Sequence, residues 1–275
     1  MKLVVQIPCF NEEQTLPLVL KGIPKKITGI DTIDVVIIDD GSTDNTVAVA
    51  KKHGVKHIVQ HTHKGLARSF HEGILKGLEL GADIIVNTDG DNQYPGERIG
   101  ELVQPIIDGA ADIVIADRQV QQIEHFSAGK KLMQRIGTKV LNIAAGTNIP
   151  DAPSGFRAYS RETAMQINVV TRFSYAMETI IQAGNKNMRI VSIPIVTNPK
   201  TRESRLFKSS FEHIRKSGSA IIRAFIMYKP IGLFVTVGTT LFILGLIPFG
   251  RFLYFVAVEN GQGHVQSLIL GSMLM

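Results

Sequence analysis

The feature that most constrains this sequence is a long run without a charged residue, "IGLFVTVGTTLFILGLIPF", from Ile231 to Phe249. A helix of about 20 apolar residues is long enough to cross a bilayer. Arg251 interrupts the run, and "FLYFVAV" continues it to Glu259. Because an arginine near a helix end can reach the lipid headgroups, we expect one long or tilted membrane span. A buried core helix of a soluble protein is the alternative.

A second apolar run extends from Val265 to Met275. We expect it to begin a second span, so that residues 230–275 form a transmembrane region of a multi-pass membrane protein. Basic residues dominate the flank before the first span: Lys200, Arg202, Arg205, Lys208, Arg215, Lys216, Arg223 and Lys229. Only Glu203 and Glu212 oppose them. The positive-inside rule therefore predicts that this flank and the N-terminal domain are cytoplasmic.

Within residues 201–229, aromatic and aliphatic side chains recur at helical spacing, while basic groups occupy much of the remaining surface. The apolar positions are Phe207, Phe211, Ile214, Ile221, Ile222 and Phe225. This pattern predicts an amphipathic helix that lies in the membrane interface and leads into the span. A solvated amphipathic core helix is the alternative.

Before this region, apolar strands alternate with helical segments. Strands are expected at residues 2–10, 33–42, 55–61, 82–91 and 111–118. Helices are expected at residues 11–23, 43–54, 65–81 and 95–110. The first helix would open at Asn11 with acids in its first turn, and the second would close at Gly54. Such alternation predicts an α/β domain, with a mainly parallel, Rossmann-like sheet sandwiched by helices.

Carboxylates cluster where the predicted strands end, which is where ligands bind in such sheets. The fourth strand ends in "NTDGDNQ", with Asp89 and Asp91 one residue apart and Gln93 next. Hard cations such as Mg²⁺ or Mn²⁺ take carboxylate and amide oxygens and leave positions for a substrate phosphate. Gly90 lets the backbone approach closely. A turn alone would also be rich in Asp and Gly, but "IDDGST" at another strand end favours the cation site.

The charge and the motif content of the sequence limit the classes of ligand that the chain is expected to bind. The net charge of +6 favours an anionic partner, and the basic residues cluster beside the span, which favours lipid and phosphate over nucleic acid. The sequence has no G-x-G-x-x-G after the first strand and no G-x-x-x-x-G-K-[ST], which disfavours a dinucleotide or P-loop site. The single cysteine, Cys9, lies in an apolar run and is expected to be a buried thiol.

Five motifs, in order, resemble glycosyltransferase family 2: "IPCFNEEQTL", "VVIIDDGSTDNT", "HKGLARSFHEG", "NTDGDNQYP" and "DAPSGFR". Their spacing suits the GT-A fold. The subgroup most similar is dolichyl-phosphate mannose synthase with the bacterial polyprenyl-phosphate glycosyltransferases, which combine this domain with an amphipathic helix and membrane spans. The resemblance covers essentially the whole chain. It implies a cytosolic GT-A catalytic domain at residues 1–200.

The resemblance also implies roles for individual residues. Those that would bind the nucleotide sugar are Pro8, Phe10, Glu12, Asp39, Lys64, Asp89, Gly90, Asp91, Gln93 and Arg118. Those that would hold the metal are Asp91 and Gln93, with Asp89 beside them on the ribose or diphosphate. Those that would act on the leaving diphosphate are Asp91, Arg118, Lys130 and Arg202.

The resemblance assigns the acceptor-binding residues less specifically than the donor-binding residues. Ser154, Gly155 and Phe156 would shape the acceptor pocket, and Arg202 and Arg205 would meet phosphates as the site closes. The subgroup usually has an arginine after the fifth strand. Here the corresponding basic residue is Lys130 or Lys131 in "GKKLMQR", with Arg135 as a competing candidate. A lysine keeps the charge but loses bidentate geometry.

Transfer to a hydroxyl needs a base, which hydroxyl-acceptor members of the family often place in a Glu-Asp pair. The matching position has Glu178 followed by Thr179. A lipid phosphate needs no base at neutral pH. We therefore expect metal-dependent, inverting transfer of a hexose from a UDP- or GDP-sugar to dolichyl or undecaprenyl phosphate.

Two alternatives remain open: transfer to a glycan hydroxyl, and a membrane-tethered nucleotide-sugar binder without turnover. The chain has no tryptophan, which counts against the Q-x-x-R-W motif of processive synthases. The intact Asp89, Asp91 and Gln93 count against a binder. The expected partners are a nucleoside diphosphate sugar, a polyprenyl phosphate and the bilayer. A homo-oligomer is compatible with the sequence.

Overall fold

The structure is a computed structural model that describes residues 1–120, 128–169, 175–199, 219, 226, 230–259 and 265–275. The chain divides into two compact units, Met1–Ile222 and Arg223–Met275. Apart from residues 219 and 226, the predicted amphipathic helix at residues 201–229 lies outside the described residues. That helix therefore stays a prediction.

The first unit is built on a seven-stranded sheet with the order β3-β2-β1-β4-β6-β5-β7. The strands are β1 Lys2–Cys9, β2 Thr32–Asp39, β3 His57–Gln60, β4 Ile84–Asn87, β5 Ile113–Asp117, β6 Arg157–Ser160 and β7 Ile190–Pro194. All five predicted strands are present, and β6 and β7 are additional. β6 runs antiparallel to both of its neighbours, β4 and β5, whereas every other pairing is parallel. The predicted α/β, mainly parallel architecture is confirmed.

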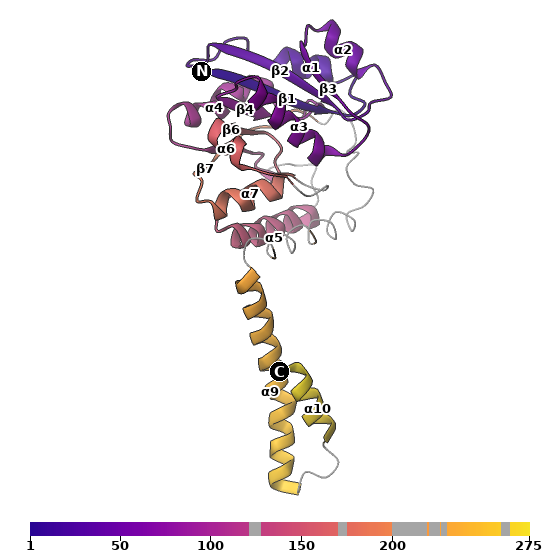
Figure 1. Cartoon of the computed structure of the whole chain (residues 1–275), viewed down its shortest axis with the longest axis vertical. Coiled ribbons are helices and arrows are strands. Elements are labelled where there is room, and N and C mark those ends of the chain that lie inside the picture. Colours follow the sequence, from indigo (N-terminus) through magenta and orange to yellow (C-terminus); the bar gives the residue numbers. More distant parts are fainter. Residues whose placement is uncertain (121–127, 170–174, 200–218, 220–225, 227–229, 260–264) are drawn as a thin grey trace. The chain divides into compact units, whose positions relative to one another are not determined.

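Helices cover both faces of this sheet (Figure 1). On one face, side chains from β1, α1 Leu16–Gly22 and α4 Ile99–Ile107 belong to a single apolar core, and the short helices α2 Thr46–Lys52 and η1 Gly96–Arg98 adjoin it. The other face carries α3 Leu66–Glu79, α6 Arg161–Gln166 and α7 Tyr175–Asn185. α5 Ala128–Ala145 packs on α7.

α3 lies unusually close to the sheet because two of its positions are glycines. A Cβ added at Gly73 would lie 2.0 Å from Oε1 of Gln6, and one at Gly77 would lie 2.7 Å from Cδ1 of Ile85. A Cβ atom does not come this close to a non-bonded heavy atom in real proteins. The two glycines of "GILKG" are therefore required for α3 to pack on β1 and β4.

The first helix differs from its prediction. α1 begins at Leu16, five residues after Asn11. Asn11 has a left-handed backbone (φ 57°), its N–H donates to Ser42 Oγ (2.9 Å), and its Oδ1 accepts the N–H of Thr43 (2.7 Å). Asn11 therefore ties the end of β1 to the loop after β2 instead of capping a helix, so the prediction for residues 11–15 was wrong. In contrast, Gly54 does follow α2 with φ 81°, as predicted.

The second unit contains α9 Pro230–Glu259 and α10 Val265–Leu274. Within α9, Pro230–Val258 is long and apolar enough to cross a membrane, with a mean hydropathy of 2.1. α10 is apolar but has 10 residues, so the predicted second span stays a prediction. The two helices meet at Gly245 and Gly271: a Cβ on Gly245 would lie 2.9 Å from the carbonyl oxygen of Gly271. Such small-residue contacts are typical of helices that associate in lipid.

Candidate active site

The strand register brings the predicted site segments to one edge of the sheet. Cys9, at the end of β1, pairs with Asp39 at the end of β2. Gln6 of β1 pairs with Asn87 at the end of β4. Because β6 is antiparallel, its first residue, Arg157, pairs with Asn87. The segment that precedes β6 therefore meets the segments that follow β1, β2 and β4.

The turn after β4 is held from both sides. The backbone N–H of Gln93 donates to Oδ1 of Asp91 (3.0 Å), and Asn92 between them adopts a left-handed backbone (φ 61°). Asn198, which follows β7, donates from its backbone N–H to the carbonyl of Gln93 (2.9 Å) and from Nδ2 to the carbonyl of Asn92 (3.0 Å). The carboxylate of Asp91 is therefore oriented before any ligand binds.

Three oxygen-bearing side chains, Asp89, Asp91 and Gln93, are half-buried in this turn. Within the described residues, no three His, Cys, Asp or Glu side chains are grouped closely enough to hold a metal ion. A Cβ on Gly90 would lie 3.1 Å from Sγ of Cys9, so the turn sits tightly on β1. This donor set fits a hard cation that takes its remaining ligands from a diphosphate.

The turn after β4 is also joined to the turn after β1. Oγ1 of Thr15 lies 2.8 Å from Oε2 of Glu12 and 2.7 Å from the carbonyl oxygen of Gly90. The backbone N–H of the buried Glu12 donates to Oγ1 of Thr46 (2.8 Å). Sequence reasoning named Glu12 and Gly90 but gave no signal for the two threonines that hold them.

Asp40, which was not predicted, organises the loop after β3. Its carboxylate accepts the backbone N–H groups of Lys64 (2.7 Å) and Gly65 (3.0 Å), and it lies 2.8 Å from Nδ1 of His63. The ring of His63 lies 4.4 Å from the ring of Phe10, at 30° to it. The loop that carries Lys64, whose side chain is exposed, is thus fixed beside Phe10.

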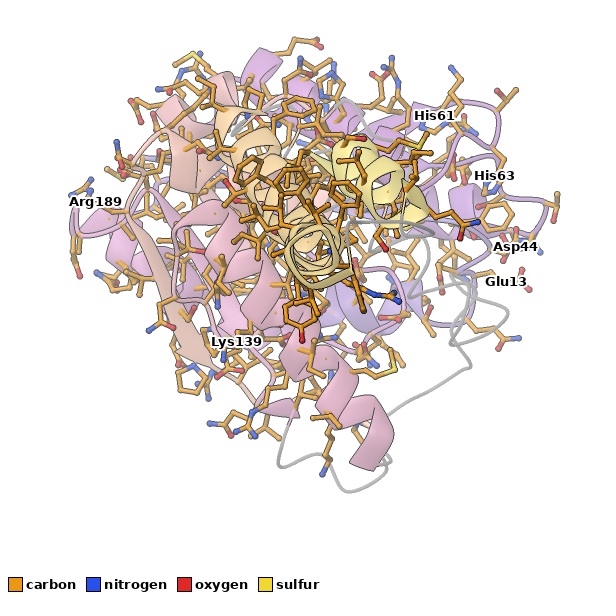
Figure 2. All side chains as sticks on the ribbon, turned by 90° about the horizontal axis from the view of Figure 1, so that it is seen from below. Glu13, Asp44, His61, His63, Lys139 and Arg189 are labelled. Carbon is orange, nitrogen blue, oxygen red and sulfur yellow. The ribbon has the colours of Figure 1, made fainter. Side chains whose placement is uncertain are left out.

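Asp39 and Pro8 occupy the adjacent buried strand ends. Asp39 accepts the N–H of Ser42 (3.1 Å) and lies 3.4 Å from Nε2 of Gln60. Figure 2 labels Glu13, Asp44, His61 and His63, which lie along the same side of the first unit in that view. Burial raises the pKa of Asp44, but hydrogen bonds from Thr46 and Glu13 outweigh it, so the pKa lies below its ordinary value.

The thiol of Cys9 lies among these acids. Burial raises its pKa well above the ordinary value, and the charges of Glu12, Asp39, Asp89 and Asp44 raise it further. The thiol therefore stays protonated and unreactive at neutral pH, and the predicted burial of Cys9 is confirmed.

Asn87 is a buried junction between the two sides of the site. Its Oδ1 accepts from Nε2 of Gln6 (2.9 Å), and its Nδ2 lies 2.8 Å from the carbonyl oxygen of Gly155 and 3.0 Å from Oη of Tyr175. Sequence reasoning missed it, although a polar residue inside "IIVNTD" was a usable signal. Asn87 holds the "SGF" loop against the strand that carries Asp89.

Gly155 is enclosed by this junction. A Cβ there would lie 2.9 Å from Oη of Tyr175 and 3.0 Å from Oδ2 of Asp89. The N–H of Gly155 donates to Oη of Tyr94 (2.9 Å), whose ring stacks on Phe156. Burial, with a further contribution from Asp89, raises the pKa of Tyr94 to about 12 despite the opposing charge of Arg118. The predicted acceptor loop is thus packed directly on Asp89.

The guanidinium of Arg118 forms an ion pair with Asp151. Its Nε and Nη2 donate to the two carboxylate oxygens of Asp151 (2.7 and 2.8 Å), and Gln134 of α5 donates to the same carboxylate (3.0 Å). Burial would lower the pKa of Arg118, but Tyr94 and Asp151 raise it above its ordinary value. Arg118 therefore orders the "DAPSGF" loop, and Asp151 is its missed partner.

The remaining predicted cations lie on or beyond α5. Lys131 is half-buried and Arg135 is exposed on this helix. The side chain of Lys130, together with Arg202 and Arg205, lies outside the described residues. Ser154 is buried, and its Oγ has no hydrogen-bond partner in the described part of the chain.

Thr179 occupies the position at which the resemblance implies an Asp in hydroxyl-acceptor enzymes. It is buried, and its Oγ1 accepts from Nη1 of Arg157 (2.8 Å). The guanidinium of Arg157 also donates to the carbonyls of Ser154 (2.7 Å), Ala176 (2.8 Å) and Ala152 (2.6 Å). Thr179 thus supports a buried arginine and offers no carboxylate.

Comparison with known proteins identifies the family. The family model described as "Glycosyl transferase family 2" matches residues 4–167, which is more than half of the chain. The chain belongs to glycosyl transferase family 2. It is therefore a glycosyltransferase, and the predicted family membership is confirmed.

Two relatives indicate the subgroup. An undecaprenyl-phosphate mannosyltransferase of Micrococcus luteus is 27% identical over 206 residues, covering 71% of this chain and 83% of the relative. A UDP-N-acetylglucosamine–dolichyl-phosphate N-acetylglucosaminyltransferase of Methanococcus voltae is 26% identical over 215 residues, covering 70% of this chain and 83% of the relative. The predicted likeness to polyprenyl-phosphate glycosyltransferases is confirmed.

A solved structure confirms the fold. Glucosyl-3-phosphoglycerate synthase from Mycobacterium tuberculosis, solved with Mn²⁺ and UDP, superposes with a TM-score of 0.62 at 18% identity, covering 82% of this chain and 79% of that one. The same enzyme was also solved with Mg²⁺ and UDP. The first unit therefore has the predicted GT-A architecture.

Proposed function

We propose that this glycosyltransferase moves a hexose from a UDP- or GDP-linked donor to a polyprenyl phosphate such as dolichyl or undecaprenyl phosphate, with inversion at the anomeric carbon. The observation that carries the proposal is Thr179, which stands where a hydroxyl-acceptor enzyme would place its base and is bound to Arg157. An acceptor that is already an anion needs no base. Relatives that act on polyprenyl phosphates support the same acceptor class.

In this proposal the nucleotide lies across the ends of β1 and β2, and its diphosphate faces the turn after β4. Phe10 and His63 form an aromatic pair for the base, and Glu12 and Asp39 offer oxygens to polar groups of the nucleoside. Asp91 and Gln93, with Asp89, would hold Mg²⁺ or Mn²⁺. The bound cation would neutralise the diphosphate as it leaves.

The chain's own residues do the rest. A phosphate oxygen of the lipid forms a bond to the anomeric carbon while the bond to the diphosphate breaks, and its electron pair leaves with the nucleoside diphosphate. Arg118, fixed by Asp151, keeps the acceptor loop against Asp89. Lys64, with Lys130 or Lys131, Arg135, Arg202 and Arg205, would supply positive charge to the two phosphates.

The proposal places the first unit on the cytoplasmic face, anchored by α9 as a membrane span. The length and composition of α9 support its crossing of a membrane. The residues preceding α9 carry the basic excess that favours this orientation. A second span that begins within residues 265–275 and a homo-oligomer are part of the same hypothesis.

The test uses membranes that contain the full chain, Mg²⁺ or Mn²⁺, undecaprenyl or dolichyl phosphate, and a panel of labelled UDP- and GDP-sugars. Label should enter the organic phase with one donor of the panel. The rate of this transfer should fall when EDTA is added, and it should fall by about 100-fold or more in Asp91→Ala. Asp108→Ala, an exposed acid at the end of α4, is the matched control and should keep full activity.

Two results would contradict the proposal. Extension of a glycan from the same donor, without lipid labelling, would establish a hydroxyl acceptor. Donor binding without any turnover across the panel would favour a nucleotide-sugar binder.

A further inference from the structure

The chain that follows β7 runs from the end of β5 to the turn after β4. The N–H of Ile195 donates to the carbonyl of Asp117 at the end of β5 (2.8 Å), and the Ile195 side chain is buried in the apolar core. Three residues later, Asn198 contacts the turn that carries Asp91 and Gln93. This short segment is therefore attached both to the sheet and to the predicted cation site.

Asn198 donates to two consecutive carbonyls of that turn. Its backbone N–H binds the carbonyl of Gln93 (2.9 Å), and its Nδ2 binds the carbonyl of Asn92 (3.0 Å). Because a carbonyl oxygen only accepts hydrogen bonds, this partner decides which end of the side-chain amide faces the turn. Asn92 and Asn198 lie 106 positions apart in the sequence, so only the folded chain brings them together.

The turn has an uncommon backbone conformation at its centre. Asn92 has a positive φ of 61°, which is unfavourable for an L-residue, and it separates the two expected cation ligands, Asp91 and Gln93. A relaxation of Asn92 would change the directions in which those two side chains point. Mg²⁺ tolerates little displacement of its oxygen ligands. A contact that holds Asn92 in place therefore acts on the geometry of the cation site.

We propose that Asn198 is a positioning residue for the divalent cation. Through the carbonyls of Asn92 and Gln93 it holds Asp91 and Gln93 in the arrangement that binds Mg²⁺ or Mn²⁺ together with a nucleoside diphosphate. The inference rests on the cation site of the proposed function and adds a residue to which the sequence motifs gave no role. Partners of this kind, which orient the ligands of a metal without touching it, commonly change metal affinity by about 10-fold or more.

An ordinary role in folding is the competing explanation, and the structure separates the two. Without its side-chain amide, residue 198 still has the backbone N–H that binds Gln93. The segment also keeps the buried Ile195 and the bond from Arg98 Nη2 to the carbonyl of Pro194 (3.4 Å). Removal of the amide should therefore loosen Asn92 and leave the rest of the segment attached.

The test measures nucleotide binding to the full chain in nanodiscs by isothermal titration. UDP and GDP are each titrated in saturating Mn²⁺ and in EDTA, and the ratio of the two Kd values gives the contribution of the cation. In the wild type, Mn²⁺ should tighten the binding of at least one nucleotide. Asn198→Ala should lower this ratio by about 10-fold and leave the Kd in EDTA unchanged.

Asn185→Ala is the matched control. Nδ2 of Asn185 donates to the carbonyl of Ile181 (2.8 Å), so the variant loses the same kind of bond within α7. Its ratio should equal that of the wild type. Asn198→Leu, which fills similar space without a donor, should behave like Asn198→Ala.

Three results would overturn the inference. The first is a wild-type ratio in both Asn198 variants. The second is equal weakening in Mn²⁺ and in EDTA, or failure of both variants to fold, since either would assign Asn198 to stability. The third is a wild type whose binding of UDP and GDP does not respond to Mn²⁺. The assay contains neither a sugar donor nor a lipid acceptor, so a failure of the proposed transfer to polyprenyl phosphate leaves its result intact.

Discussion

The two halves of the site edge differ in how they hold charge. The half after β1, β2 and β4 is acidic, and its carboxylates Asp89 and Asp91 are half-buried. The half between β5, β6 and α7 carries two arginines, Arg118 and Arg157, whose donors already bind protein oxygens. In our proposal the acidic half binds the donor and its cation, whereas the arginines of the basic half hold the fold together. Substitutions should therefore affect activity in the first half and stability in the second.

The largest effect should come from the buried arginine. Arg157→Met removes donors to the carbonyls of Ser154, Ala152 and Ala176, which would be left unsatisfied in the core. We expect the free energy of unfolding to fall by about 3–5 kcal/mol, or the first unit to fail to fold. Chemical denaturation followed by circular dichroism measures it. Arg189→Met, on an exposed pair with Asp112, is the control and should change little.

The next substitution should affect both stability and activity, because Asn87 joins the two halves of the site edge. Asn87→Leu removes the Nδ2 group that donates to the carbonyl of Gly155 and to Oη of Tyr175, and leaves that carbonyl only the longer bond from the Tyr175 hydroxyl (3.4 Å). We expect a loss of about 2–3 kcal/mol in the free energy of unfolding, together with a lower kcat at saturating donor. Thermal melts and initial rates measure the two effects. A stable variant with normal kcat would show that the halves act independently.

The dependence of stability on pH can test the role of Tyr94, which packs in the basic half of the site edge. The folded pKa of about 12 exceeds the ordinary value of 10, so the folded state holds this proton more tightly. Stability from Tyr94 is complete below pH 10 and is lost as the pH rises towards 12, amounting to about 2 kcal/mol. Tyr94→Phe should lose less stability than wild type over this range. Identical slopes in denaturation at pH 9–12 would contradict the assignment.

The smallest effect is expected where the acidic half is cross-linked by a single hydroxyl. Thr15→Val keeps the shape of the side chain but removes the hydroxyl between Glu12 and Gly90. We expect a loss of about 1 kcal/mol in stability and a modest rise in donor KM. Isothermal titration with UDP and Mn²⁺ would detect the change in affinity. A loss greater than that of Asn87→Leu would reverse the proposed ranking.

The sequence predicted the parallel part of the sheet because each of those strands is a continuous apolar run followed by polar turn residues. It could not place β6, since "RAYS" is too short to show a period, and its antiparallel insertion depends on which strand edge is free. Likewise, "IDDGS" shows two acids, but only the folded strand end decides that Asp39 accepts the N–H of Ser42 while Asp40 accepts N–H groups of the loop after β3.

The misplaced start of α1 has a similar cause. "NEE" has the composition of a helix N-terminus, and local propensity favoured that reading. The competing partners, Ser42, Thr43 and Thr46, lie more than 30 residues away in the chain. Asp151 was visible in "DAPSGFR", but its pairing with Arg118 required the position of β5 beside β6.

The insertion of β6 between β4 and β5 has a consequence for synthesis on the ribosome. β3, β2, β1 and β4 can pair as soon as residue 87 has emerged, but the partner of Asn87 is Arg157, about 70 residues later. At roughly 5–20 residues per second, the open edge of β4 waits about 4–14 s for its neighbour. During that interval the nascent chain presents an unpaired strand to other chains, and a chaperone that shields it would raise the yield of folded enzyme.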